Sequence, residues 1–193
     1  MKPTITVFLL FLGLSLLQAQ KNSGKICFKD GRCLSGLIQI KGNKVLFRTS
    51  KSDPKKVFNF EKVHSFNYSN RKRASFSFEY VPIKKQGKPQ ILQVIVSGTV
   101  KLYKQNNASF SMNDGIGNYK DTSTYYLKKG NEQTATLYVA FGYIPKTNFK
   151  KVSFLYFKDC LDLVNRIDRN EFKKEDYKEI IEFYNTNCGE ISL

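Results

Sequence analysis

"QILQVIVSGTVKLYKQ", residues 90–105, has the strongest β-strand composition in the chain and decides the fold class. Its apolar residues lie on both sides of a Ser97–Gly98 break and comprise Ile91, Leu92, Val94, Ile95, Val96, Val100, Leu102 and Tyr103. Continuous apolar runs rich in β-branched residues are typical of strands that are buried on both faces. We therefore place this segment in the interior of a β-sheet.

The flanking segments predict an antiparallel, meander-rich β body over about residues 25–157. Asp30–Gly31 and Gly42–Asn43 divide short apolar runs, and they are turn dipeptides because Gly and Asn tolerate positive φ. A further hairpin is predicted around Gly130–Asn131, followed by a last strand in residues 150–157. Residues 105–122 are polar and rich in Gly and Asn, which predicts a long loop. Partial closure of the body into a barrel near the N-terminus is left open.

The C-terminal segment "FKDCLDLVNRIDRNEFKKEDYKEIIEFYNTNC", residues 157–188, has helical periodicity. Asp159 is a candidate N-cap of a first helix, in which Cys160, Val164 and Ile167 follow at i, i+4 and i+7. The apolar residues of a second helix are Tyr177, Ile180, Ile181, Tyr184 and Cys188. Because the connection at 168–172 is short, the helices should form an antiparallel hairpin over about residues 159–188. The predicted fold class is α+β.

The four cysteines predict two structural disulfides. An antiparallel helical hairpin brings Cys160, at the start of its first helix, close to Cys188 at the end of its second. A three-residue hairpin loop would place Cys27 opposite Cys33, whereas a two-residue turn would place Cys27 opposite Leu34. Crossed pairing between the two halves stays open, because four cysteines allow three connectivities. The chain has no CxxC motif and only one histidine, so neither a redox pair nor a zinc site is expected.

The N-terminus has the layout of a secretory signal peptide. Lys2 precedes an apolar stretch from Ile5 to Leu17, and the small residue Ala19 follows at the expected cleavage position. The alternative is a membrane anchor, but the stretch is shorter than the ~20 apolar residues that span a bilayer. We predict a signal peptide over residues 1–19 and a single mature domain over residues 20–193, without a transmembrane segment. The protein should be exported, either periplasmic or secreted, where disulfides persist.

The chain is strongly basic, with 32 lysines and arginines against 16 acidic residues. Such an excess favours association with polyanions through general electrostatics. The triplet Arg71, Lys72 and Arg73 directly precedes the aromatic residues Phe76 and Phe78, and it is the candidate anion-binding cluster. Basic residues beside aromatics could bind nucleic acid, but a basic turn before an ordinary strand explains the same pattern. For an exported protein the expected partners are an anionic glycan, a lipid head group or another envelope protein.

We find no catalytic constellation in the sequence, and no cofactor is expected. His64 is the only histidine, and neither a G-x-S-x-G elbow nor a glycine-rich phosphate loop is present. Glu61, Glu79 or Asp114 could belong to a glycosidase pair, although any chain of this size contains such carboxylates. The leading hypothesis is an exported non-enzymatic interaction protein whose basic surface binds anionic envelope or extracellular polymers. The alternative is a carboxylate-dependent hydrolase that acts on an envelope glycan.

Several short motifs carry a resemblance: "KDGRCLSG" (29–36), "SGTVKLY" (97–103), "YYL" (125–127), "YFKDC" (156–160) and "EIIEFYNTNC" (179–188). Together they resemble a loose set of uncharacterised exported proteins of Bacteroidota. The resemblance covers most of the mature chain and implies an envelope or secreted location. It implies no activity, cofactor or site residue.

Overall fold

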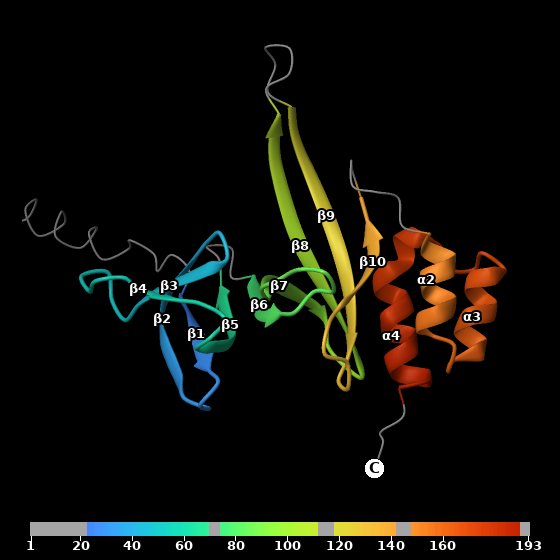
Figure 1. Ribbon diagram of the computed structural model, residues 1–193, viewed down its shortest axis with the longest axis horizontal. Helices are drawn as coiled ribbons and strands as arrows, with labels where there is room; N and C mark the ends of the chain where they lie inside the picture. The colour runs from blue at the N-terminus through green and yellow to red at the C-terminus, as the bar shows by residue number, and fades with distance from the viewer. Residues whose placement is uncertain (1–22, 70–73, 112–117, 142–147, 190–193) are drawn as a thin grey trace, which may run out of the picture.

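The computed structural model describes residues 23–69, 74–111, 118–141 and 148–189 (Figure 1). Ten strands form one sheet: β1 (Ser23–Phe28), β2 (Cys33–Lys41), β3 (Lys44–Arg48), β4 (Lys56–Phe58), β5 (Val63–Ser69), β6 (Ser75–Val81), β7 (Gln90–Val96), β8 (Val100–Ser111), β9 (Asn118–Lys129) and β10 (Thr136–Ala140). The helical part comprises α2 (Phe149–Tyr156), α3 (Leu161–Asp168), the 3-10 turn η2 (Lys174–Asp176) and α4 (Tyr177–Asn187). Within the described ranges, each helix is too short or too polar to cross a bilayer. The predicted α+β class is confirmed.

The sheet is an open antiparallel meander with one insertion. Its strand order is β10-β9-β8-β7-β6-β5-β1-β2-β3-β4. The strands from β5 to β10 follow chain order, whereas β1 lies between β5 and β2 and pairs with both, for example through Ile26 opposite Phe66. Among the described strands, β4 and β10 are the two edges. The sheet therefore does not close into a barrel, and of the two possibilities left open by the sequence the open body is the one that forms.

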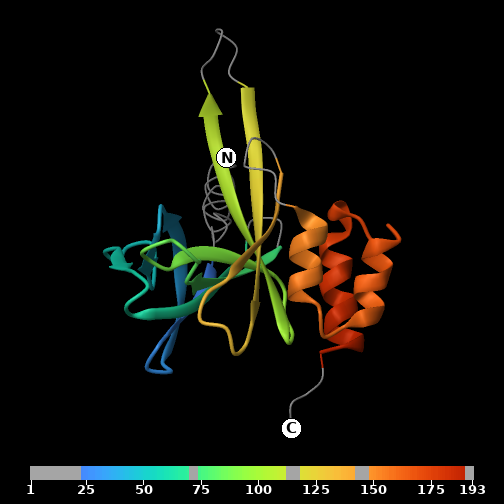
Figure 2. The same cartoon turned by 45° about the vertical axis from the view of Figure 1, so that its right-hand side comes forward.

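The strands β1 to β5 curl around a small core of their own at one end of the molecule (Figure 2). Their inward residues alternate with outward ones along each strand, as the period of two requires. The buried members of this core are Ile26, Ile38, Val45, Phe47, Val63 and Phe66. Phe66 stacks on Phe78 of β6, with ring centroids 5.1 Å apart, and extends the core along the sheet.

The three helices cover one face of β8, β9 and β10 at the other end of the molecule (Figures 1 and 2). Buried residues from both layers form the larger core: Val96, Val100, Leu102, Tyr125, Leu127, Tyr138, Val139, Phe157, Cys160, Leu163, Ile167, Ile180, Ile181 and Tyr184. Asn185 of α4 joins the helices to the sheet, because its amide donates to the Val100 carbonyl at 2.9 Å and accepts from the Val100 N–H at 2.8 Å.

The helix α2 contradicts the sequence-based prediction of a strand in residues 150–157. Asn148 caps it, since the side chain of Asn148 accepts a hydrogen bond from the Lys151 N–H at 3.0 Å. Phe149, Val152 and Tyr156 lie at i, i+3 and i+7 and pack toward the larger core. The β body therefore ends at Ala140 rather than near residue 157, and the C-terminal region has three helices instead of two.

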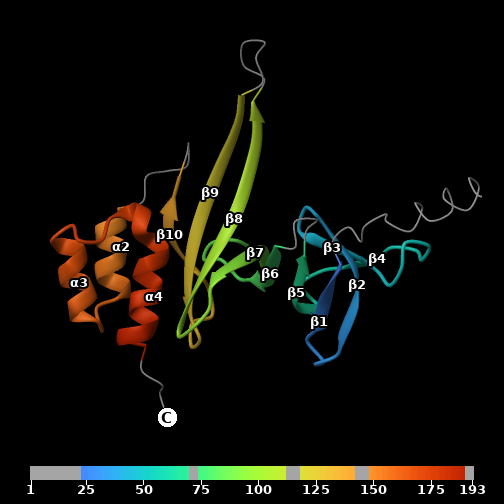
Figure 3. The same ribbon diagram turned by 180° about the vertical axis from the view of Figure 1, so that it is seen from behind.

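The hairpin of β8 and β9 corrects the prediction of a loop over residues 105–122. The two strands pair from Val100 opposite Lys129 to Ser111 opposite Asn118, and they rise well beyond the rest of the sheet (Figure 3). Backbone pairing continues here although the sequence is polar, because the antiparallel ladder is formed by main-chain N–H and C=O groups. Residues 112–117 lie outside the described ranges.

Both predicted disulfides are present. Cys27 pairs with Cys33 in the register of β1 and β2, with Cα atoms 4.1 Å apart, as the three-residue loop requires. Cys160 pairs with Cys188, with Cα atoms 5.7 Å apart, and joins the start of α3 to the end of α4. Two disulfides and no free cysteine among the described residues are typical of proteins outside the reducing cytoplasm.

Asp159 has a different role from the predicted N-cap. The helix α3 begins at Leu161 with Cys160 in the cap position, and no side chain caps it. One carboxylate oxygen of Asp159 instead accepts hydrogen bonds from Lys129 of β9 and Tyr184 of α4, both at 2.8 Å. Asp159 thus ties the loop before α3 to the sheet and to the last helix.

Candidate binding site beside the β2–β3 turn

The sequence-predicted site residues fall into two groups. Arg71, Lys72 and Arg73 lie outside the described residues. The four cysteines are engaged in the structural disulfides. The candidate binding site consists of other residues.

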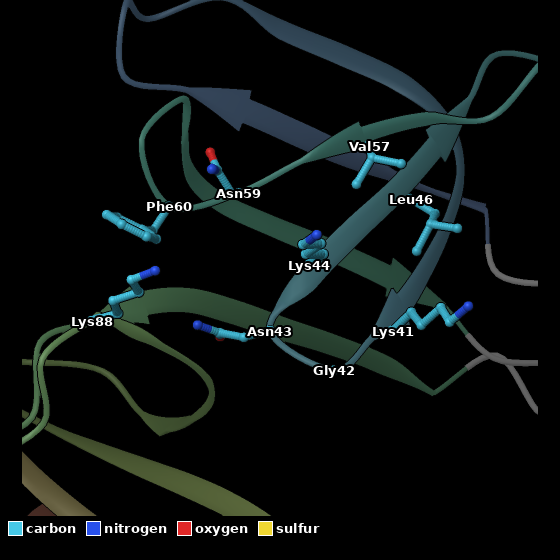
Figure 4. Close-up of a pocket in the computed structure, with 9 residues that line it drawn as sticks. All are labelled: Lys41, Gly42, Asn43, Lys44, Leu46, Val57, Asn59, Phe60 and Lys88. Carbon is cyan, nitrogen blue, oxygen red and sulfur yellow. The ribbon is translucent and has the colours of Figure 1, made fainter.

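A basic hollow of about 810 Å³ opens beside the turn between β2 and β3. Its lining comes from three connections, the β2–β3 turn, the segment around β4 and the β6–β7 connection, and consists of Lys41, Gly42, Asn43, Lys44, Leu46, Val57, Asn59, Phe60 and Lys88. Figure 4 shows Lys44 between Phe60 on one side and Val57 on the other. We call this site the basic hollow. Its lining includes three lysines and no acidic residue.

The lysines of the basic hollow repel one another. Lys41 and Lys44 are directly opposite across the hairpin, and like charges in this position destabilise a strand pair. Lys88 adds a third charge from the β6–β7 connection. Among the described residues, none of these ammonium groups has an acidic oxygen within ion-pair distance. An anion bound here would relieve the repulsion, because it would supply the missing countercharge.

Apolar side chains form the floor of the basic hollow. Leu46 and Val57 are paired across β3 and β4, and Val57 is 57% exposed. Phe60 lies on the opposite side, where its ring packs against Tyr80 with centroids 6.4 Å apart. The hollow can therefore contact the uncharged part of a ligand as well as its anionic group.

A second hollow, of about 430 Å³, lies on the other side of the same turn. Its lining is Ile40, Gly42, Asn43, Tyr68, Phe78, Gln90, Ile91, Gln93, Lys104 and Gln105. Side-chain amides and apolar groups dominate it, with one lysine and no acidic residue. We call this site the amide hollow. Gly42 and Asn43 line both hollows, so the two are neighbours.

Asn43 fixes the turn between the two hollows. Its side-chain amide donates to the Pro89 carbonyl at 2.7 Å and accepts from the Ile91 N–H at 2.9 Å. Its backbone carbonyl accepts from the Tyr80 hydroxyl at 3.2 Å, and burial raises the pKa of Tyr80 to about 12. These hydrogen bonds connect the turn to β6 and β7. They therefore fix the distance between the two hollows.

Glu79 forms a separate polar cluster on β6. Its two carboxylate oxygens accept hydrogen bonds from Lys101 at 2.8 Å and from Tyr103 at 2.7 Å. Burial opposes ionisation of Glu79, but the hydrogen bonds from Lys101 and Tyr103 outweigh it, so the pKa of Glu79 lies below its ordinary value of 4.5. Both oxygens have partners, which gives Glu79 the character of a structural residue that joins β6 to β8.

We expect the stability of the protein to fall in acid. The folded-state pKa of Glu79 is lowered, so the stabilisation from its carboxylate is complete above pH 4.5 and is lost as the pH falls through the lowered folded-state value. The folded-state pKa of Asp159 is also lowered, from its ordinary value of 3.8, because hydrogen bonds from Lys129 and Tyr184 outweigh the effect of burial. The stabilisation from this carboxylate is therefore also lost in acid. Urea unfolding at pH 7, 5, 4 and 3 tests this. The variant Glu79→Gln should lose about 1–2 kcal/mol at pH 7 and show a shallower acid decline; an unchanged acid decline would contradict the assignment.

The carboxylates nominated for hydrolysis are dispersed in the fold. Glu79 belongs to the cluster with Lys101, Glu61 accepts a hydrogen bond from the Asn59 side chain at 3.3 Å, and Asp114 lies outside the described residues. Glu61 does share a third hollow, of about 470 Å³, with Asp30. Hydrogen bonds from the side chain and backbone of Arg32 lower the pKa of Asp30, which keeps this carboxyl ionised.

Within residues 23–69, 74–111, 118–141 and 148–189, no three His, Cys, Asp or Glu side chains come together to hold a metal ion. His64 is exposed, and it lies at an irregularity in the pairing of β5 with β1, where Ser65 and Val63 are opposite consecutive residues.

The sequence contained one signal for the basic hollow that sequence reasoning missed. Lys41 and Lys44 flank the predicted turn Gly42–Asn43, and a hairpin with this turn places them opposite each other. Lys88 had no such signal, because the fold alone brings the β6–β7 connection to this turn.

Comparison of the chain with known protein families, with curated proteins and with solved structures found no match in any of the three. The functional conclusion accordingly depends on the geometry and chemistry of the two hollows.

Proposed function

We propose that the protein is an exported interaction protein that binds an anionic polymer through the basic hollow. The observation that carries the proposal is the set of three lysines, Lys41, Lys44 and Lys88, which line one open hollow without an acidic residue. The repulsion between Lys41 and Lys44 is a cost to folding. Binding of a polyanion gives this cost a functional reason, and the open shape of the site suits an extended polymer.

The distribution of charge along the chain supports the same proposal. The described residues 23–69 and 74–96, which include β1 to β7, contain 13 lysines and arginines against 4 acidic residues. Residues 148–189, which include the helices, contain 8 of each. Charge asymmetry of this kind steers polyanions to one end of a molecule and raises association rates. The basic hollow lies within the charged half.

Export is part of the proposal. The N-terminal signal layout and the two disulfides agree with a periplasmic or extracellular location. Acidic polysaccharides and anionic lipid head groups are the polyanions of such compartments, whereas nucleic acid is not expected there.

The carboxylate-dependent hydrolase is the second candidate, favoured by the shared hollow of Asp30 and Glu61. A glycosidase needs one carboxyl that stays protonated to act as general acid. Arg32 keeps Asp30 ionised, because the ion pair at 2.7 Å favours the carboxylate, so the general acid of such a pair would have to be Glu61. Release of reducing ends from an acidic polysaccharide, abolished by Glu61→Gln, would establish the hydrolase.

The triple variant Lys41→Gln, Lys44→Gln and Lys88→Gln tests the binding function. Three exposed ion pairs of ~0.5 kcal/mol each correspond to about a tenfold rise in Kd. We expect this loss for two chemically different probes, polygalacturonate and inorganic polyphosphate, measured by titration at 50 mM salt. Raised salt should weaken binding of the unmodified protein to both probes.

A matched control removes the same charge from the helical end. Lys151, Lys158 and Lys178 are exposed, and the ion pair of Lys178 with Glu182 is a surface pair of little energetic weight. Their triple replacement by Gln should leave Kd within about twofold. Equal losses in the two triple variants would refute a localised site, and no loss in either would refute the proposed function.

A further inference from the structure

The chemistry of the amide hollow differs from that of the basic hollow beside it. Phe78, Gln93 and Lys104 form one row across β6, β7 and β8, where Phe78 is opposite Gln93 and Gln93 is opposite Lys104. Neighbouring strands are ~4.8 Å apart, so the row offers an aromatic ring, an amide and an ammonium group at regular steps. Among the described residues, no group hydrogen-bonds the Gln93 side chain, which is partly exposed.

The two other glutamines of the amide hollow keep part of their hydrogen-bonding capacity. The Gln90 amide nitrogen donates to the Lys88 carbonyl at 2.8 Å, which leaves its carbonyl oxygen available. The Gln105 carbonyl oxygen accepts from the Tyr126 hydroxyl at 3.0 Å, which leaves its NH2 group available. The amide hollow therefore presents donors and acceptors together.

Such a mixture fits hydroxyl groups better than it fits an anion. A hydroxyl both donates and accepts, as a side-chain amide does, whereas a carboxylate, sulfate or phosphate only accepts. An anion at this position would leave the Gln90 carbonyl oxygen without a donor, because the Gln90 nitrogen is already bound to the Lys88 carbonyl. Ile40 and Ile91 supply apolar surface for the C–H groups of a ligand, and the volume lies within the ~300–1,000 Å³ of small-molecule sites.

Base stacking has less support than sugar binding. The rings of Phe66 and Tyr68 each stack on Phe78, with interplanar angles of 10° and 8°, so these rings largely cover one another. Nucleic acid recognition through aromatic residues needs an uncovered ring face for each base. A polyhydroxylated ring needs only the amides and an apolar wall.

We propose that the amide hollow binds a sugar ring of an acidic polysaccharide whose charged group lies in the basic hollow. Both hollows share Gly42 and Asn43, and Asn43 holds their separation constant through its bonds to Pro89 and Ile91. The inference rests on the proposed function, because the basic hollow provides the anion contact. It adds the ligand class, an acidic glycan, and a subsite that recognises hydroxyl groups.

The test compares Gln93→Leu, which keeps the side-chain size but removes every polar atom, with the same replacement at the exposed Gln133 of the β9–β10 turn. Three probes are titrated: polygalacturonate, inorganic polyphosphate and a single-stranded thymidine oligonucleotide. We expect Gln93→Leu to raise the Kd for polygalacturonate about three- to tenfold and to leave the Kd for polyphosphate unchanged. Gln133→Leu should change neither. Thermal melting with both disulfides intact verifies that each variant is folded.

The outcomes separate the two proposals. An unchanged polygalacturonate Kd in Gln93→Leu, with the lysine triple variant still weakened, overturns the sugar subsite and keeps the proposed function. Unchanged binding in the lysine triple variant overturns the proposed function itself. Equal losses for polygalacturonate, polyphosphate and the oligonucleotide in Gln93→Leu show a general charge or folding effect and also overturn the sugar subsite. If Gln93→Leu melts early, Gln90→Ala provides the second variant, with the same selective loss expected.

Discussion

Replacement of Phe157 by alanine should lower the free energy of unfolding by about 3–5 kcal/mol. Phe157 is fully buried at the end of α2, and its ring contacts Tyr138 of β10 and Tyr184 of α4, with centroids 6.1 and 5.1 Å away. It therefore fills the space where α2, α4 and the sheet meet. Alanine would leave a cavity that α2, α4 and the sheet cannot close. Urea denaturation followed by far-UV circular dichroism measures the change.

The matched control is Phe157→Leu, which keeps most of the apolar volume and should cost less than about 1.5 kcal/mol. A second control places the same large-to-small change at Phe60, on the wall of the basic hollow, where the side chain is partly exposed. A loss below about 1 kcal/mol in Phe157→Ala would contradict the central position of this ring.

Removal of the disulfide between Cys160 and Cys188 should lower the free energy of unfolding by about 3–4 kcal/mol. The sequence separation of 28 residues sets this value through the entropy of loop closure in the unfolded chain. The double variant Cys160→Ala and Cys188→Ala should melt earlier than the unmodified protein, and reductant should have the same effect on the unmodified protein.

The second disulfide provides the comparison. Cys27 and Cys33 are only 6 residues apart, and the same relation gives about 2 kcal/mol for the double replacement. Reductant added to the Cys27→Ala and Cys33→Ala double variant breaks the remaining disulfide between Cys160 and Cys188. We expect this step to lower the free energy of unfolding by the larger amount. Identical melting of all oxidised and reduced forms would contradict a stabilising role for either bond.

Features with a local signal could be predicted from the sequence. Of the two registers that the Asp30–Gly31 turn allows, the three-residue loop places Cys27 opposite Cys33, and Gly31 adopts the positive φ of 86° that this loop needs. The helical period of residues 160–188 placed Cys160 and Cys188 on facing sides of a hairpin. Spacing within these short segments favours both pairings over the crossed ones, which four cysteines also allow.

Features set by the tertiary structure could not be predicted in this way. The helix α2 is short, and residues 150–157 are aromatic and β-branched enough to resemble a strand, so the packing against β10 decides its conformation. The basic hollow needs β1 between β5 and β2, which brings the β6–β7 connection to the β2–β3 turn. No sequence pattern near Lys88 predicts that arrangement.

The uneven division of charge gives the molecule a permanent electric dipole along its long axis, with the basic strands at one end and the neutral helices at the other (Figure 1). A polyanion would turn such a molecule before contact, so that the strand end arrives first. Proteins docked in this way along a polymer would share one orientation. The electrically neutral, disulfide-bonded helices would then face outward along the polymer and shield its charge.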